Sequence, residues 1–289
     1  MKFDVVLGNP PYNRGIDLDF VNLGFDLCTK YCVMITPAKW QTAKADQTVA
    51  SKIINYGQFR EKLVPHMSKV AFYPDASDIF DIRIYGGISY FIIEKDSKQN
   101  KCEVLNKSRL QKRFNNTEER SIRKGEILNN TGQEMVEYLD RYTKISEFET
   151  NGRYQVWITD TYDSSSNGLC MFGRDGNTGV LCPSRIIDSK HEKNTIGTAR
   201  LLFASDSRVE CQNMISWLYT KFTRFFILLA VDGFHIGGNM HYYRFVPAPP
   251  ETKSGNPWDH IYTDEELYKA FNLPQKYIDV IEAVIKERK

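Results

Sequence analysis

The residues best suited to chemistry lie near the start of the chain, in the stretch FDVVLGNPPYN (3–13). Asn9 carries a side-chain amide oxygen, and the proline pair Pro10-Pro11 restricts the backbone so that the Pro10 carbonyl points in one direction. Two such acceptors can hold the two N–H bonds of an exocyclic amine, which favours a more pyramidal nitrogen with its lone pair free to attack. Tyr12 adds a flat ring on which a base can stack, worth roughly 1–3 kcal/mol. The stretch therefore predicts a site that binds and activates the amino group of a nucleobase.

A second group of candidate residues is positively charged and could contact DNA. The stretch NKSRLQKRFNNTEERSIRK (106–124) has seven Lys or Arg against two Glu, which fits either a solvated linker or a phosphate-binding segment. Aromatic residues in the middle of the chain could contact bases, although ordinary core packing is the simpler explanation for them. The DNA-contact candidates are Lys107, Arg109, Lys112, Arg113, Arg174, Arg185 and Lys190, and the aromatic candidates are Tyr154, Trp157, Tyr162 and Phe172.

A nuclease is the competing enzyme class. Pro74-Asp75 followed by Asp96-Ser97-Lys98 loosely imitates the P-D…D/E-x-K metal site of restriction endonucleases, a pattern that is common by chance. The six cysteines form no C-x-x-C pair, and the five histidines do not cluster near them at ligand spacing. We therefore predict no metal site and reduced thiols.

Composition indicates a soluble, cytoplasmic globular protein. Of the 289 residues, 42% are hydrophobic and 26% are charged, which is the balance of an ordinary folded chain with a sizeable core. The formal net charge of +2 is compatible with a polyanionic partner but too small to argue for one. The longest purely apolar run, FFILLAV (225–231), is far shorter than a membrane span, so no membrane association is expected.

The first hundred residues alternate between strand-like and helix-like segments. Periodicity predicts strands over 3–8, 32–37, 69–74 and 86–96, with helices over 19–31 and 42–64. Strands that alternate with helices of this length are typical of βαβ units and a largely parallel sheet. The predicted fold class is thus α/β, and ligands of such sheets bind at the carboxyl ends of the strands, where Asn9 lies.

The later part of the chain has a different character. Residues 132–142 and 205–231 have helical spacing, and Ser205 or Asp206 is the expected cap of the longer segment. Thr263 and Glu266 have the spacing of a capping box, and Pro274 starts another amphipathic helix. Its apolar face is formed by Ile278, Ile281 and Ile285.

Several of these stretches resemble amino-group DNA methyltransferases. NPPY is similar to their motif IV, in the form typical of N6-adenine enzymes, and CVMITPAKW resembles the strand and loop that follow it. The segment VAFYPDASDIFDIRIYGGISYFIIEKD (70–96) looks like the motif VIII hairpin of adenine methylases from restriction–modification systems, with a gamma-like motif order. YRFVPAPP and the helical tail are similar to the closing segment of the same enzymes, while 105–204 is the least recognisable part.

The resemblance implies an enzyme that flips an adenine out of double-stranded DNA and methylates its N6 atom with S-adenosylmethionine. Asn9, Pro10, Pro11 and Tyr12 would form the catalytic corner, and Phe80 would stack on the base opposite Tyr12. Gly8 and Asn9 would lie beside the cofactor. Pro37 and Trp40, after the second strand, would either line the base pocket or, as the simpler expectation, form a structural loop.

The resemblance also implies a division of the chain into three parts. Residues 1–104 would be the C-terminal half of the catalytic domain with a partial Rossmann-type sheet, 105–250 an α+β target-recognition domain, and 251–289 a C-terminal helical segment. The glycine-rich S-adenosylmethionine motif, which in this family precedes NPPY, is not found, and none of the 18 glycines forms a G-x-G pair. We expect either an incomplete methyltransferase, its other half lying in a longer reading frame or a separate subunit, or a DNA-recognition module without catalysis of its own.

Overall fold

The computed structural model divides into two compact units, Met1–Glu134 and Met135–Lys289, each described here by itself. The residues that the structure describes are 1–13, 15–47, 53–73, 76, 79–80, 87–98, 100–107, 115–122, 130–158, 184–197, 199–230 and 240–285.

The first unit begins with a βαβ segment. Strand β1 (Phe3–Gly8), as predicted, is followed by helix α1 (Ile16–Leu27) and strand β2 (Cys28–Pro37), which pairs with β1 in parallel. Gly15 precedes the helix at φ 91°, a backbone conformation that glycine adopts without steric cost. The helix ends four residues before the predicted boundary, because the chain passes directly into β2 to pair with β1.

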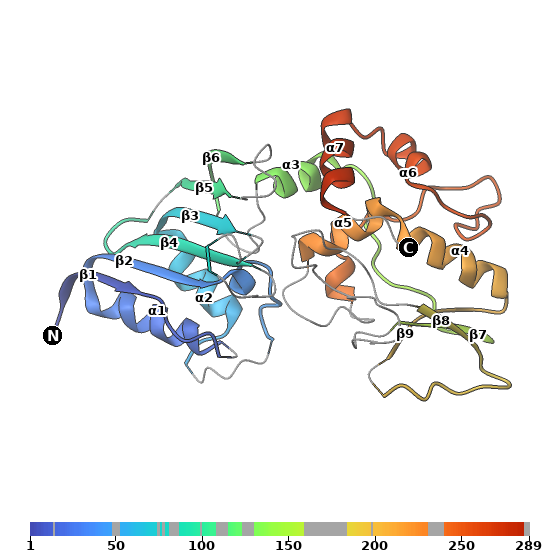
Figure 1. Ribbon diagram of the computed structural model, residues 1–289, viewed down its shortest axis with the longest axis horizontal. Coiled ribbons are helices and arrows are strands. Elements are labelled where there is room, and N and C mark those ends of the chain that lie inside the picture. The colour runs from blue at the N-terminus through green and yellow to red at the C-terminus, as the bar shows by residue number, and fades with distance from the viewer. Residues whose placement is uncertain are drawn as a thin grey trace. The chain divides into compact units, whose positions relative to one another are not determined.

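The rest of the first unit completes a mixed six-stranded sheet in the order β1-β2-β4-β3-β5-β6 (Figure 1). Strand β4 runs antiparallel between β2 and β3, whereas β3 and β5 pair in parallel. The sheet therefore continues past residue 104, and its unit ends at Glu134. The remaining elements are the 3-10 helix η1 (Ala38–Gln41), α2 (Tyr56–Leu63), η2 (Val64–His66), β3 (Met67–Tyr73), β4 (Ile88–Glu94), β5 (Cys102–Asn106) and β6 (Asn116–Arg120).

Helices α1 and α2 cover one face of this sheet (Figure 1). Leu18 and Val21 of α1 and Phe59 of α2 are buried in the same core cluster as Met34 and Phe91 from the sheet. The architecture is a mixed α/β layer, compatible with a Rossmann-like methyltransferase fold.

The predicted helix over 42–64 is wrong in its first part. Among the described residues of 42–64, only Tyr56–Leu63 is α-helical, and η1 ends before residue 42. The start is set by a capping box, in which the Asn55 side chain accepts from the Gln58 amide at 2.8 Å and the Gln58 side chain accepts from the Asn55 amide at 3.0 Å.

The second unit combines a small antiparallel sheet, in the order β8-β7-β9, with helices. Its strands are β7 (Tyr154–Ile158), β8 (Ser184–Asp188) and β9 (Arg200–Ser205). Helix α3 (Asn130–Tyr138) contains the boundary between the units. The other helices are α4 (Arg208–Tyr219), α5 (Lys221–Ala230), η6 (Met240–Tyr243), α6 (Asp264–Ala270) and α7 (Gln275–Val284).

The long helix predicted over 205–231 is two helices that break at Thr220. Thr220 leaves the helical region at ψ 149°, and its hydroxyl donates to the Trp217 carbonyl at 2.8 Å. The cap of α4 is Ser207 rather than Ser205 or Asp206. The Thr263 cap of α6 is confirmed, since its hydroxyl accepts from the Glu266 amide at 3.2 Å. Within the described residues, no helix is long and apolar enough to cross a membrane.

Candidate functional site

The proposed amine-binding corner lies at the carboxyl end of β1. Asn9 follows directly after the strand and is exposed, whereas Pro10 is buried. The Tyr12 hydroxyl donates to the Asn9 Oδ1 atom at 2.5 Å and lies 3.4 Å from the carbonyl of Ile35 in β2. The Tyr12 hydroxyl that holds the Asn9 oxygen is thus also close to the backbone of β2.

The acceptors of this corner are only partly used. An amide oxygen has two lone pairs, so Asn9 Oδ1 can accept from an amine as well as from Tyr12. The Pro11 carbonyl accepts from the Asn13 amide at 3.1 Å, which tightens the turn, and the Asn13 carbonyl accepts from Ile16 at the start of α1. No backbone amide among the described residues donates to the Pro10 carbonyl. The Asn9 oxygen, on an exposed side chain, can therefore take a further N–H donor, whereas the Pro10 carbonyl belongs to a buried residue.

A buried carboxyl group that the sequence analysis missed lies close to this corner. Asp17, in the first turn of α1, is 5% exposed. Burial raises the pKa of Asp17 to about 6, helped by the charge of Asp19 and opposed by Lys39. Burial, together with the Asp17 charge, also raises the pKa of Tyr12, so its hydroxyl keeps the proton that it donates to Asn9. The sequence signal for this residue is weak, because an aspartate in the first turn of a helix is common and is usually exposed.

The aromatic residues predicted near the base have different environments. Phe80 is half-buried and lies in the segment between β3 and β4. Trp40 is fully buried, and its indole N–H donates to the Ser89 hydroxyl at 3.1 Å. Its ring packs against Phe59 and Phe91 in the core, which agrees with the structural role expected for its loop. Pro37, the last residue of β2, is half-buried.

The described residues at this corner do not fit a complete S-adenosylmethionine site. A Cβ atom added at Gly8 would lie 2.7 Å from the Sδ atom of Met34, so the glycine makes room for a core side chain rather than for a ligand. Asn9 and Pro10 are the residues expected to accept from an amine, and nothing described beside them forms the glycine-rich cradle that a nucleotide requires.

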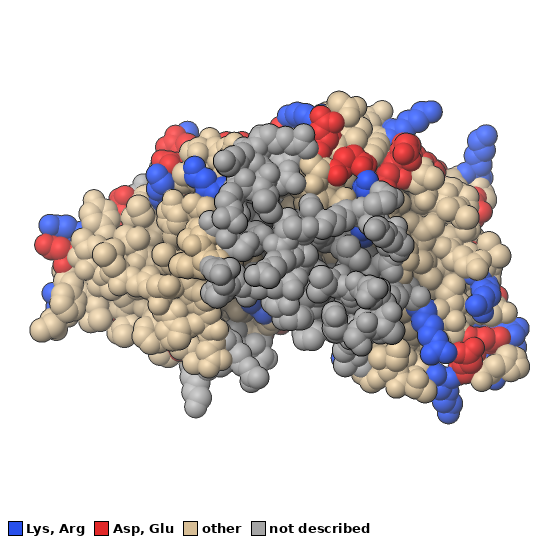
Figure 2. All heavy atoms as spheres, in the orientation of Figure 1, with Lys and Arg blue, Asp and Glu red and all other residues tan. Residues whose placement is uncertain are grey.

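The predicted DNA-contact residues are only partly within the described chain. Arg185 is exposed and forms an ion pair with Glu192 at 2.8 Å, while Lys190 is exposed in the turn after β8. Lys107 is half-buried, directly after β5. On the face that Figure 2 shows, the described basic side chains of the second unit are interspersed with acidic ones. Arg109, Lys112, Arg113 and Arg174 lie outside the described residues, as do Tyr162 and Phe172.

The residues of the alternative metal site are only partly within the described chain. Pro74 and Asp75 lie outside the described residues, and Asp96 is exposed just after β4. In the part of the chain that the structure describes, no three His, Cys, Asp or Glu side chains group closely enough to hold a metal ion.

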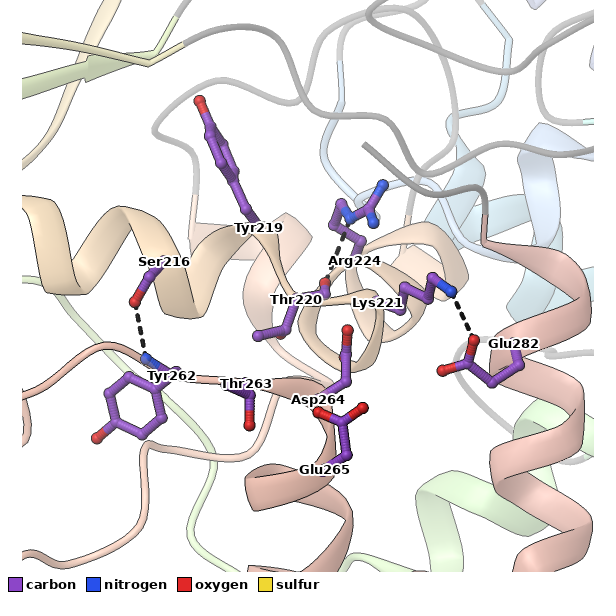
Figure 3. A pocket seen from close by; sticks show the side chains of 10 residues that line it. All are labelled: Ser216, Tyr219, Thr220, Lys221, Arg224, Tyr262, Thr263, Asp264, Glu265 and Glu282. Atoms are coloured by element: carbon purple, nitrogen blue, oxygen red, sulfur yellow. Dashed lines mark hydrogen bonds and ion pairs between the residues drawn. The ribbon is translucent and has the colours of Figure 1, made fainter. Parts of the chain in front are cut away.

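A cavity of about 610 Å³ lies in the second unit, between the α4–α5 junction, the start of α6 and α7 (Figure 3). Lys221 and Glu282 form an ion pair across it at 2.5 Å, and the buried Arg224 donates to the Thr220 carbonyl at 3.3 Å. Burial raises the pKa of Asp264 in its wall. Its lining is polar and of mixed charge: Ser216, Tyr219, Thr220, Lys221, Arg224, Tyr262, Thr263, Asp264, Glu265 and Glu282.

Comparison with known proteins relates half of this chain to a methylase. Over 172 residues, 52% of the chain, it is 33% identical to a Mycoplasma pneumoniae protein named as an uncharacterized adenine-specific methylase. The matched region is 38% of that relative, so the chain spans well under half of its length. No family model matches the chain. Among solved structures, the type IIG restriction endonuclease BpuSI aligns with 54% of this chain and 21% of its own, at 13% identity and a TM-score of 0.29.

Proposed function

We propose that this chain provides the amine-binding corner of an adenine-specific DNA methyltransferase of a restriction–modification system. The observation that carries the proposal is the exposed Asn9 amide, which lies at the carboxyl end of β1 with its oxygen held by the Tyr12 hydroxyl. Similarity over half of the chain to a protein named as an adenine-specific methylase supports the choice of adenine.

In this proposal the corner activates the N6 amino group of a flipped base. An adenine amine is a poor nucleophile because its lone pair is delocalised into the ring. The Asn9 oxygen and the Pro10 carbonyl each accept one of its N–H bonds, which localises the lone pair and stabilises the positive charge that develops on nitrogen. Tyr12 and Phe80 hold the base plane from either side, and this positioning replaces the stacking lost on extrusion from the duplex.

The proton leaves the nitrogen after it has become cationic, so no group with a tuned pKa is needed before attack. S-adenosylmethionine is the methyl donor of this class of reaction. The described residues of this chain supply the amine acceptors and not the cradle for that donor.

DNA reading is assigned to the segment 105–250, whose larger part, from Met135 on, belongs to the second unit, and 251–289 is assigned to a supporting helical segment. Arg185, Lys190 and Lys107 are the described candidates for phosphate or base contacts, together with the basic residues outside the described chain. The α+β composition of the second unit, a three-stranded sheet with helices, is suitable for such a domain.

The proposal is tested by an Asn9→Ala substitution in the full-length polypeptide that contains these residues. Transfer of tritiated methyl groups to adenine-containing duplex DNA should fall by at least about 100-fold, the usual scale for loss of an oriented charge-stabilising group. Duplex affinity, measured by fluorescence anisotropy, should change little because Asn9 contacts only the flipped base.

Asn13→Ala is the matched control, since the exposed Asn13 lies in the same turn and contributes only backbone hydrogen bonds to it among the described contacts. It should retain methylation. Full methylation by the Asn9→Ala variant would refute the role of the corner. Tight DNA binding by the wild type without any methylation would favour the recognition-module alternative.

A further inference from the structure

Asp17 is a buried carboxyl group whose negative charge does not stabilise the fold. The residue is 5% exposed, and among the described residues the hydrogen-bond donor to its carboxylate is its own backbone amide. No described cation forms an ion pair with it. An aspartate in the first turn of a helix normally stabilises the helix, because in water its charge favours the helix dipole. Here burial dominates and raises the pKa of Asp17 from 3.8 to about 6, so ionising this group opposes folding at neutral pH.

The local backbone keeps Asp17 beside the proposed amine-binding corner. The Asn13 carbonyl, directly after the corner, accepts from the first amide of α1 at 3.0 Å, and Gly15, at φ 91°, turns the chain into that helix. The charge of Asp17 acts on Tyr12, whose hydroxyl holds the Asn9 oxygen. A negative charge is therefore held within electrostatic reach of the acceptor proposed for the amine.

The other described charges that act on Asp17 come from two elements. Asp19, on α1 itself, adds a second negative charge, and Lys39 of η1 supplies a positive one. From α2, Lys62 contacts the opposite end of α1, where it forms an ion pair with Asp26 at 3.3 Å. Asp17 is the buried member of this group, and its neighbours Asp19 and Lys39 shift its ionisation in opposite directions.

We propose that Asp17 is a positioning residue of the amine-binding corner, whose ionised carboxylate favours the positive charge that forms on the amine during methyl transfer. The inference rests on the proposed function for the reaction. Asp17 acts at a distance and through Tyr12, which keeps its proton and so remains the donor to Asn9. A charge that is fixed before the reaction needs no reorganisation as the cation forms. One charge acting over about 10 Å at an effective dielectric constant of about 20 changes a rate by roughly 10-fold.

The first test is the pH dependence of single-turnover methylation by the full-length polypeptide that contains these residues. The wild-type rate should fall by about 10-fold on acidification, with a midpoint at about pH 6, as Asp17 takes up a proton. Asp17→Asn should be about 10-fold slower than wild type at neutral pH and should show no such fall. Asp26→Asn, which changes an exposed carboxylate at the other end of the same helix, is the control and should keep the rate and the pH profile.

Substitution of the two neighbours should move the midpoint in opposite directions. Asp19→Asn should shift it to lower pH, because the charge of Asp19 adds to burial in raising the pKa of Asp17, and Lys39→Met should shift it to higher pH. At neutral pH, Asp17→Asn should not lower the urea midpoint of the first unit, because the carboxylate that it removes opposes folding there. A lower rate at unchanged or higher stability separates a role in the reaction from a structural role.

A second measurement does not depend on methyl transfer. Methylammonium, a small cation that stands for the methylated amine, should lower the pH midpoint of the Asp17 carboxyl resonance in carbon-13 NMR of the 289-residue chain. Sodium at the same concentration should not do so, and Asn9→Ala should abolish the effect of methylammonium.

The possible outcomes separate this inference from the proposed function. Methylation with a rate and pH profile that Asp17→Asn leaves unchanged would overturn the role of Asp17 and leave the proposed function intact. A methylammonium effect without methylation by the wild type at any pH would support the charge of Asp17 at a cation site and refute the proposed function. Neither methylation nor a methylammonium effect would overturn both.

Discussion

Replacing Arg60 by leucine should loosen the loop that follows β2, beside the proposed amine-binding corner. Arg60 lies on α2 and is only 6% exposed. Its Nη1 atom donates to the Trp40 and Ala43 carbonyls, both at 2.8 Å, and so joins this loop to the helix.

The expected cost follows from these two bonds. Hydrogen bonds from a charged donor contribute about 1.5–3 kcal/mol, and each buried carbonyl left without a donor costs about 1–3 kcal/mol. Removing the buried charge and burying a leucine offsets part of this loss. We expect Arg60→Leu to lower the free energy of unfolding of the first unit by about 2–4 kcal/mol.

Urea unfolding monitored by hydrogen–deuterium exchange measures this loss of stability, because peptides from β1, β2 and α2 report on the first unit alone. Lys62→Leu on the same helix is the control. The exposed Lys62 forms an ion pair with Asp26 at 3.3 Å, so its loss should cost less than about 1 kcal/mol. Equal effects of the two substitutions would refute the argument that Arg60 joins the loop to the helix.

Two further predictions concern a close packing contact and a charged cluster. Gly8→Ala should destabilise the first unit by about 1–3 kcal/mol in urea unfolding, because the new Cβ atom meets the Met34 sulfur. The cost of Gly8→Ala should be smaller in a Met34→Ala background. Strictly additive effects of the two substitutions would contradict this packing argument. His260 contacts the Asp259 and Glu266 carboxylates at 2.6 and 2.7 Å, and these contacts, with Asp259 first, raise the pKa of His260. The stabilisation of the fold by protonated His260 is therefore complete below the ordinary histidine pKa of about 6.5. It is lost as the pH rises through the raised pKa. His260→Gln should lower the melting temperature most near pH 6 and least near pH 9, and a pH-independent difference would exclude the ionic contribution.

The elements that follow from local sequence were predictable. Strand β1 was predicted at its observed bounds, since its apolar run ends at a glycine and a proline pair. The Thr263 cap and the helix after Pro274 were also predicted. Of the predicted apolar face, Ile281 and Ile285 are buried and Ile278 is half-buried. In each of these cases the signal lies within a few residues of the element.

The elements that depend on distant contacts were not predictable. Strand β2 begins at Cys28, within the predicted helix, because its first residues pair with Phe3 and Val5. The start of α5, after its break from α4, is stabilised by a residue far along the chain. The Phe222 amide there donates to the Asp264 carboxylate at 2.8 Å. A residue forty-two positions away that caps a helix leaves no periodic signal in the helix itself.

The sequence by itself determined the chemistry of the corner, because the donors and acceptors of Asn9, Pro10 and Tyr12 and the stiffness of the proline pair are covalent properties. Only the tertiary structure decided which acceptors stay available, that Asp17 is buried nearby, and which edge of β1 is left open. These depend on burial and on strand pairing between segments distant in sequence, which exist only once the chain has folded.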